Sequence, residues 1–258
     1  GGTGVTTVAA VLAMAAHVDG KASQTLDMTG LAQKGGPVLS HVRFALNPDD
    51  IKAGKTPPAS ADVIIACDLV VASSGDALVM FDKQRTSVVA NHDVTPTKEI
   101  IDNRNVRFDP DLLTARVRSR AKAFAATNAE ALAEHHFGDA IYTNMIMLGM
   151  AYQNGLIPIS DTAIYEANRL NKVKVKENAA AFDLGRIAAA NPDAVQAAAP
   201  KRPEIEPLKL DELIARRAEM LKAYQNAAYA DLYEARVARV RAAESNLGLG
   251  EQLTTAAA

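Results

Sequence analysis

The sequence predicts an α/β fold with three layers, in which a mainly parallel sheet lies between helices on both faces, followed by a long C-terminal helical arm. Short apolar strand patterns alternate with helical patterns in the first 190 residues, and one strand pattern is apolar without interruption. A proline-rich stretch then precedes a helical run with its own apolar stripe. We therefore expect a domain over 1–190, a linker over 191–208 and a helical arm over 209–258.

The first expected helix follows a glycine turn, Gly1-Gly2-Thr3-Gly4, and runs from Thr3 to about His17. Because such turns usually follow a buried strand, we expect the first strand of the domain to lie ahead of Gly1. Two strands are expected next, at Ala22–Met28 and Val38–Leu46. Val63–Cys67 is the uninterrupted apolar strand, which predicts burial on both faces.

The later elements follow from the same patterns. A helix over 68–81 is expected to break near Ser73–Gly75, and a strand follows at Ser87–Asn91. The next segments are an extended piece at 123–127 and helices near 110–119, 128–136, 138–154, 160–170 and 173–190, with Ser160 as a helix cap. One helix of roughly 50 Å is expected over Leu210–Glu244, packed against another domain or chain. Its predicted apolar stripe is Leu210, Ile214, Leu221, Tyr224, Ala228, Leu232 and Ala235.

Composition excludes several classes of protein. The chain has 258 residues, with 28 basic and 30 acidic side chains. Its net charge therefore produces no overall positive electrostatic potential that would attract nucleic acid or anionic lipid. A single cysteine excludes a disulfide framework, a four-cysteine zinc site and a self-contained iron–sulfur cluster. The longest apolar stretches are too short or too interrupted to span a bilayer. We expect a soluble, cytoplasmic protein.

The glycine turn is the first candidate binding motif. Unpaired amides at a helix N-terminus favour anions, and Asp27 follows Gly4 by 23 residues, where dinucleotide-binding folds carry an acidic residue for the ribose. This pattern leaves open a nicotinamide-dependent dehydrogenase that uses Gly1, Gly2, Gly4 and Asp27. A tight turn without any ligand explains the glycines equally well.

The loop between the two early strands is the second candidate. Gln33-Lys34-Gly35-Gly36 offers a flexible backbone, an amide and an ammonium group, which suit a phosphate. His41 and Arg43 share one face of the strand that follows. The alternative is a hairpin connection with a solvated Lys34 and with structural roles for His41 and Arg43.

The run from Leu26 to Arg43, with the opening Gly-Gly-Thr-Gly-Val, resembles the gamma domain of two-oxoacid:ferredoxin oxidoreductases, most closely the indolepyruvate branch in its fused bacterial form. The segments 138–149, 163–182 and 210–244 also resemble parts of that family. The resemblance implies a non-redox domain of a thiamin-diphosphate enzyme that decarboxylates an arylpyruvate, forms acyl-coenzyme A and reduces ferredoxin.

The same resemblance implies how cofactors and partners are distributed. Thiamin diphosphate, magnesium and [4Fe-4S] clusters would lie in partner domains or subunits, and this chain alone would hold none of them. Ferredoxin, coenzyme A and a second copy of the chain are further expected partners. The candidate binding residues are Gly1, Gly2, Gly4, Gln33, Lys34, Gly35, Gly36, His41 and Arg43. A purely structural interaction module remains a third interpretation.

Two other features have simple structural interpretations. Cys67 lies in a buried-strand pattern, which predicts an inert core residue. His135 and His136 are expected at the solvated C-terminus of a helix, where a cationic histidine is favoured.

Overall fold

A computed structural model describes residues 4–29, 36–93, 109–193, 195, 208–248 and 250–258. The chain divides into two compact units, Gly1–Pro200 and Lys201–Ala258. Most of the predicted linker over 191–208 lies outside the described residues.

The first unit contains strands and helices in alternation after an opening helix and hairpin. The strands are β1 (Ala22–Thr29), β2 (Val38–Ala45), β3 (Val63–Ala66), β4 (Ser87–Asn91) and β5 (Ala123–Thr127). The helices are α1 (Val5–Val18), η1 (Pro48–Asp50), α2 (Leu69–Ala72), α3 (Gly75–Leu78), α5 (Pro110–Arg118), α6 (Ala129–Phe137), η2 (Ala140–Tyr142), α7 (Thr143–Gln153), α8 (Asp161–Asn171) and α9 (Val175–Ala190).

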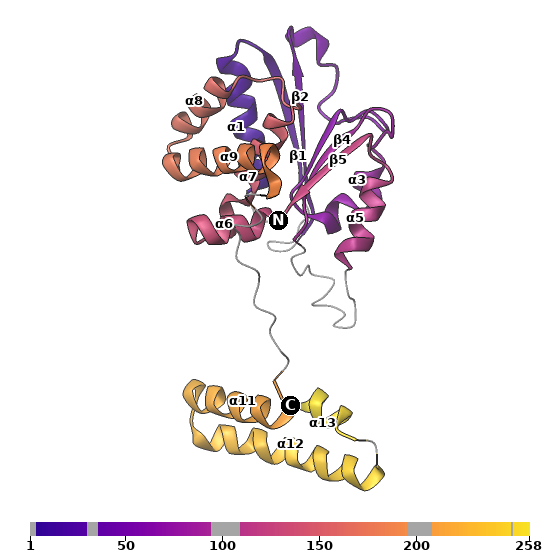
Figure 1. Ribbon diagram of the computed structural model, residues 1–258, viewed down its shortest axis with the longest axis vertical. Helices are drawn as coiled ribbons and strands as arrows, with labels where there is room; N and C mark the ends of the chain where they lie inside the picture. Colours follow the sequence, from indigo (N-terminus) through magenta and orange to yellow (C-terminus); the bar gives the residue numbers. More distant parts are fainter. Residues whose placement is uncertain (1–3, 30–35, 94–108, 194, 196–207, 249) are drawn as a thin grey trace. The chain divides into compact units, whose positions relative to one another are not determined.

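The predicted fold class is confirmed, with one refinement in the sheet. β3, β4 and β5 form a parallel sheet in that order, whereas β1 and β2 pair with each other as an antiparallel hairpin. Figure 1 shows α1 and α6 to α9 on one side of the strands and α3 and α5 on the other. Alternate side chains of the parallel strands enter these two layers, because successive residues of a strand point to opposite faces.

Two apolar clusters hold the layers together. Ile65, Val89 and Ala125 join the larger cluster, which α1, α6, α7, α8 and α9 build on one face. Val88 and Phe124 belong to the cluster on the opposite face, with side chains from α2 and α5. This alternation explains why neighbouring side chains of β4 are both buried, on opposite faces: Val88 is 1% exposed and Val89 is 0% exposed.

β3 differs from the prediction of burial on both faces. Val63, Ile64 and Ile65 are only half-buried. Among the described strands β3 lies at one end of the parallel sheet, so it has a neighbour on one side only. An uninterrupted apolar run therefore identifies the strand correctly but does not establish its place in the sheet.

Local sequence signals account for the helix starts. The Asp68 carboxylate accepts hydrogen bonds from the amides of Val70 and Val71 at the start of α2. The predicted break between α2 and α3 is confirmed, because Ser74 caps α3 by accepting from the Ala77 amide. The predicted cap at Ser160 is also confirmed. Each cap satisfies an amide that the first turn of a helix leaves unpaired.

The contact between α7 and α9 depends on two glycines. A Cβ atom added to Gly149 would lie 1.9 Å from the Phe182 carbonyl oxygen, and one added to Gly185 would lie 1.9 Å from the Ile146 carbonyl oxygen. Neither glycine has a positive φ angle, so close approach of the two backbones is the reason that glycine is required there.

The second unit is helical, as predicted, but the prediction of a single helix over Leu210–Glu244 is wrong. The chain forms α11 (Leu210–Tyr224) and α12 (Ala227–Leu247), which pack against each other, and then α13 (Gln252–Ala257). Asn226 ends the continuity, since its side chain accepts a hydrogen bond from the Tyr229 amide and starts a new helix. The break also shifts the inner face of α12.

The predicted apolar stripe assumed one uninterrupted helix across Gln225 and Asn226. The stripe residues that fall in α12 are therefore exposed. Leu232 is 47% exposed, whereas Ala230 and Val237 are buried. Glu244, two turns after Val237, is 1% exposed and lies on the same inner face. Its carboxylate accepts hydrogen bonds from the Leu253 amide at 2.7 Å and from the amide and hydroxyl of Thr254 at 2.8 and 2.6 Å. Glu244 thus caps α13.

Candidate functional site

The carboxyl ends of β3, β4 and β5 define the edge at which ligands bind in open α/β sheets. Asn91 ends β4, and its side-chain oxygen accepts a hydrogen bond from the Ala129 amide at 2.9 Å, in the first turn of α6. The Asp93 carboxylate accepts from the Ala131 amide at 3.2 Å. These two side chains fix the start of α6 at this edge, because α6 directly follows the end of β5.

The glycine turn lies at the same edge. Gly4 has a φ angle of +87°. A Cβ atom added to it would lie 3.5 Å from the side-chain nitrogen Nδ2 of Asn144, in the first turn of α7. That turn packs near α6, and α7 packs on β3 and β4. Among the side chains that the structure describes, none caps the start of α1 at Gly4. Gly1 and Gly2 lie outside the described residues.

The β1–β2 hairpin brings the second candidate motif to this end of the domain. α1 and β1 are joined by a short connection and pack side by side, so β1 returns to the end from which α1 starts. The hairpin connection therefore begins and ends near Gly4. Of the four loop residues, Gln33, Lys34 and Gly35 lie outside the described residues, and Gly36 is buried.

His41 and Arg43 contact a neighbouring segment of the chain. The His41 Nδ1 atom accepts a hydrogen bond from the Thr56 amide at 3.2 Å, and the Arg43 guanidinium donates to the Ala53 carbonyl at 2.8 Å. His41 is 5% exposed, and among the described residues its Nε2 atom has no hydrogen-bond partner. Burial, together with the nearby Lys55, lowers the pKa of His41 and favours the neutral ring. These contacts are typical of residues that hold a loop in place.

The acidic residue of the dinucleotide pattern has a different environment from the one that nicotinamide binding requires. Asp27 lies in β1, and its carboxylate accepts a hydrogen bond from the Ser40 hydroxyl across the hairpin at 2.6 Å. β1 pairs antiparallel with β2 and is not part of the parallel sheet. The dehydrogenase interpretation is therefore not favoured.

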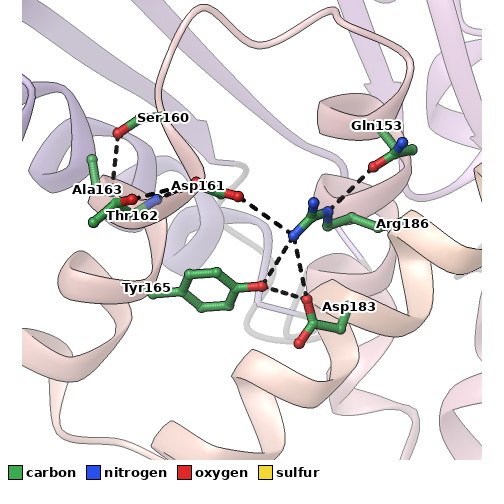
Figure 2. A network of polar contacts seen from close by, with 8 residues as sticks. All are labelled: Gln153, Ser160, Asp161, Thr162, Ala163, Tyr165, Asp183 and Arg186. Atoms are coloured by element: carbon green, nitrogen blue, oxygen red, sulfur yellow. Dashed lines mark hydrogen bonds and ion pairs between the residues drawn. The ribbon is translucent and has the colours of Figure 1, made fainter.

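A polar network at the opposite end of α7 was not predicted from the sequence. The Arg186 guanidinium donates to the Tyr165 hydroxyl at 3.2 Å and to Gln153 at 3.3 Å, and it lies 3.6 Å from both Asp161 and Asp183 (Figure 2). The Tyr165 hydroxyl donates to Asp183. Burial and this hydrogen bond raise the pKa of Tyr165. The sequence did not predict this network because its five residues are spread over three helices and form no local pattern.

A shallow pocket of about 650 Å³ lies beside this network, lined by Lys21, Tyr152, Gln153 and Arg186 among others. Its charged groups already have partners. Lys21 donates to the Pro158 carbonyl and pairs with Asp19, while Arg186 is surrounded by two carboxylates. The network therefore joins α7, α8 and α9 without leaving an excess of positive charge for an anion.

The remaining candidate residues, Cys67, His135 and His136, show no sign of a catalytic or metal-binding role. Burial, with a contribution from Asp68, raises the pKa of the Cys67 thiol to about 12, so this cysteine is neutral near pH 7 and unsuited to nucleophilic attack. His135 and His136 are exposed at the end of α6, as predicted. Within the described ranges, no group of three or more His, Cys, Asp or Glu side chains could hold a metal ion. No helix in those ranges has the length and apolar character of a membrane span.

Comparison with known proteins supplies the family. Residues 1–188 match the pyruvate ferredoxin/flavodoxin oxidoreductase family, and residues 210–258 match a family of unknown function, DUF6537. The chain is 30% identical over 194 residues to the indolepyruvate oxidoreductase subunit IorB of Pyrococcus horikoshii. This alignment covers 73% of this chain and 92% of that protein. It is 28% identical to the subunit of the same name from Archaeoglobus fulgidus, over 66% of this chain and 80% of that protein.

A solved structure agrees at the level of the fold. The pyruvate oxidoreductase subunit PORC of Thermotoga maritima superposes with a TM-score of 0.50 and 19% sequence identity, over 72% of this chain and 89% of that chain. The resemblance inferred from the segment 26–43 and the glycine turn is confirmed by these matches.

Proposed function

The chain belongs to the pyruvate ferredoxin/flavodoxin oxidoreductase family, and from this membership we propose that it is the gamma-type part of an indolepyruvate-type two-oxoacid:ferredoxin oxidoreductase. The observation that carries the proposal is the match of residues 1–188, together with the relatives named as indolepyruvate oxidoreductase subunits. The complete cytoplasmic enzyme would convert an arylpyruvate and coenzyme A to an acyl-coenzyme A and carbon dioxide, and pass electrons to ferredoxin.

The cofactors of such an enzyme do not fit the residues of this chain. A [4Fe-4S] cluster needs several cysteine thiolates, whereas this sequence contains only Cys67, whose thiol has a pKa raised to about 12. Magnesium bound with thiamin diphosphate needs oxygen ligands gathered at one place, and the described residues contain no cluster of three or more His, Cys, Asp or Glu side chains that could hold a metal ion. We assign these cofactors to partner domains or subunits.

The role we assign to this chain is to border the active site of the assembled enzyme. The carboxyl edge of the sheet supports this role, because the start of α1 at Gly4 and the ends of the hairpin connection meet there. Gln33, Lys34, Gly35 and Gly36 would border the coenzyme A or active-site pocket, with Lys34 placing a compact positive charge near phosphate. His41 and Arg43, which hold Ala53 and Thr56 against β2, would contribute from the strand that follows this loop.

The test is a kinetic measurement on the complete enzyme. Lys34→Ala should raise the Michaelis constant for coenzyme A severalfold with little change in kcat, since a charge that binds substrate and transition state equally acts on binding alone. Gly35→Val should lower turnover while the melting temperature changes little. Unchanged kinetics in both variants would remove the loop from the site, and a loss of stability without loss of specific activity would reduce it to a structural turn.

A second copy of the chain and ferredoxin are further proposed partners of the assembled enzyme. The family assignment itself is tested by asking whether arylpyruvate-dependent ferredoxin reduction requires this chain. Catalytic partners that reduce ferredoxin at the same rate without residues 1–190 would contradict the proposed role.

A further inference from the structure

The strap, residues 52–58, belongs to the connection between β2 and β3 and contains no helix or strand. It lies across one face of the β1–β2 hairpin. A Cβ atom added to Gly54 would lie 3.4 Å from the side-chain nitrogen of Gln24 and 3.5 Å from the Cβ atom of Leu26. Leu26 pairs with His41 across the hairpin, and the side chains of paired residues lie on the same face. The strap therefore covers the face on which His41 lies.

Two side chains of β2 hold the strap on this face, and they do so by opposite chemistry. The Arg43 guanidinium donates a hydrogen bond to the Ala53 carbonyl at 2.8 Å. The His41 ring instead accepts, because its Nδ1 atom takes a hydrogen bond from the Thr56 amide at 3.2 Å. The two residues after Thr56 are prolines, which have no amide hydrogen, so Thr56 is the last backbone donor of the strap.

The contact between His41 and Thr56 exists only while Nδ1 is unprotonated. A neutral imidazole carries one ring proton, and with Nδ1 as the acceptor that proton lies on Nε2. A second proton would turn Nδ1 into a donor that faces the Thr56 amide, which is also a donor. Since His41 is 5% exposed, its positive charge would also be poorly hydrated. The Arg43 contact does not respond in this way, because guanidinium stays charged.

The charges around the ring oppose its protonation. Burial, followed by repulsion from Lys55 in the strap, holds the pKa of His41 below its ordinary value of 6.5. Lys52 is the other charged residue of the strap, and Arg43 is a further cation on the same face of β2. The Asp27 carboxylate lies on the opposite face of the hairpin. On the face under the strap, β1 presents uncharged side chains, namely Gln24, Leu26 and Met28.

The direction of the pH effect follows from linkage. Because the folded state lowers the pKa of His41, the unfolded state binds the proton more readily. The stability that the neutral ring contributes is therefore complete above about pH 6.5, and it is lost as pH falls through the folded-state pKa.

We propose that His41 and Thr56 form a pH-sensitive latch, in which the neutral ring holds the strap on the hairpin and the protonated ring releases the Thr56 end of the strap. Release is local, because Arg43 still holds Ala53 and because the Ala61 amide, beyond the strap, donates to the Met80 carbonyl at 3.1 Å. The released strap uncovers part of the hairpin face in mildly acidic solution. The latch goes beyond the proposed enzyme function and does not depend on it.

The experiment is a nuclear magnetic resonance titration of the 258-residue chain, labelled with ¹⁵N, from about pH 8 to about pH 5. At the high end, the imidazole nitrogen shifts should place the His41 proton on Nε2. The Thr56 amide shift should follow the titration of the His41 ring with the same midpoint, below 6.5. Protection of the Thr56 amide from hydrogen exchange, relative to its intrinsic rate at each pH, should fall at least about threefold.

Two variants and one internal control separate the ring from general effects of acid. His41→Asn replaces the ring by an amide that does not titrate, so the pH dependence at Thr56 should disappear. His17→Asn, at an exposed histidine of α1, is the matched variant and should titrate like the wild type. The Ala61 amide, which donates to a backbone carbonyl, should keep its protection within about twofold.

Four results would overturn the proposal. A His41 proton on Nδ1 at about pH 8 would exclude the ring as the acceptor. A Thr56 amide that does not follow the His41 titration, or a pH dependence that persists in His41→Asn, would assign the change to another group. Equal loss of protection at Ala61 would indicate general unfolding in acid. The wild-type titration decides between these outcomes even if His41→Asn does not fold.

Discussion

Replacing Gly185 with alanine tests the closest backbone contact described above, between α7 and α9. The added Cβ atom would lie 1.9 Å from the Ile146 carbonyl oxygen and 2.7 Å from its carbonyl carbon. Since ordinary contacts of a carbon atom begin near about 3.5 Å, the two helices would have to separate locally by about 1.5 Å. Backbone atoms cannot rotate away from the new methyl group as a flexible side chain could.

The magnitude follows from what surrounds the contact. Ile146 and Phe182 are 0% exposed, so separating the helices loosens the centre of the larger apolar cluster. Overpacking of this kind costs about 3 kcal/mol, even after the gain of about 1 kcal/mol that alanine brings to a helix. For a unit of this size, a loss of about 3 kcal/mol corresponds to a melting temperature lower by about 6–12 °C.

Thermal unfolding followed by circular dichroism measures this difference, and Gly75→Ala in α3 is the matched control. Apart from the adjacent backbone, no heavy atom of the described residues lies within 4 Å of a Cβ added at Gly75, and its φ angle is not positive, so this variant should melt at the wild-type temperature or slightly above it. Gly149→Ala should behave like Gly185→Ala, because its Cβ atom would meet the Phe182 carbonyl oxygen at 1.9 Å. If Gly185→Ala melted within about 1 °C of the wild type, the tight crossing of α7 and α9 would be refuted.

Three further outcomes are expected. Tyr165→Phe removes the hydroxyl that joins Asp183 and Arg186 and should lower the free energy of unfolding in urea by about 1 kcal/mol. Arg169→Ala removes the exposed Arg169–Glu166 pair and should have a clearly smaller effect, because exposed ion pairs are screened by solvent; equal losses would contradict the role of the network. Burial acts to raise the pKa of Glu244, but the hydrogen bonds from Thr254 and Leu253 outweigh it, and the net direction is below the ordinary value of 4.5. Its contribution is therefore complete above about pH 4.5 and is lost as pH falls through the folded-state pKa, so amides of α13 should lose exchange protection in acid. Glu244→Gln should remove that pH dependence while Glu251→Gln at an exposed pair retains it, and an unchanged profile in Glu244→Gln would exclude this carboxylate as its source. The purified chain should show no iron–sulfur absorbance, because Cys67 is its only thiol; a stoichiometric absorbance band would contradict the distribution of cofactors proposed above.

The sequence by itself determined most of the elements of this chain and the family to which it belongs. Apolar periodicity identified β4 and β5 at their observed bounds, Ser160 marked a helix start, and the predicted break near Ser73–Gly75 is confirmed. These features depend on residues close together along the chain, which is why a linear pattern reveals them. The glycine turn and the 26–43 segment revealed the family for a related reason, since their glycines and polar residues are contiguous.

Only the tertiary structure decided which elements are neighbours. The sequence could not show that β1 and β2 form their own hairpin, or that β3 lies at the end of the described parallel sheet, because strand pairing is set by contacts between distant residues. For the same reason it could not reveal that Gln153, Tyr165 and Arg186 meet from three helices. The two-residue break at Gln225 and Asn226 changed which residues form the inner face of α12. Gly149 and Gly185 are required because the backbones of α7 and α9 approach closely, and a local sequence pattern does not show such a contact.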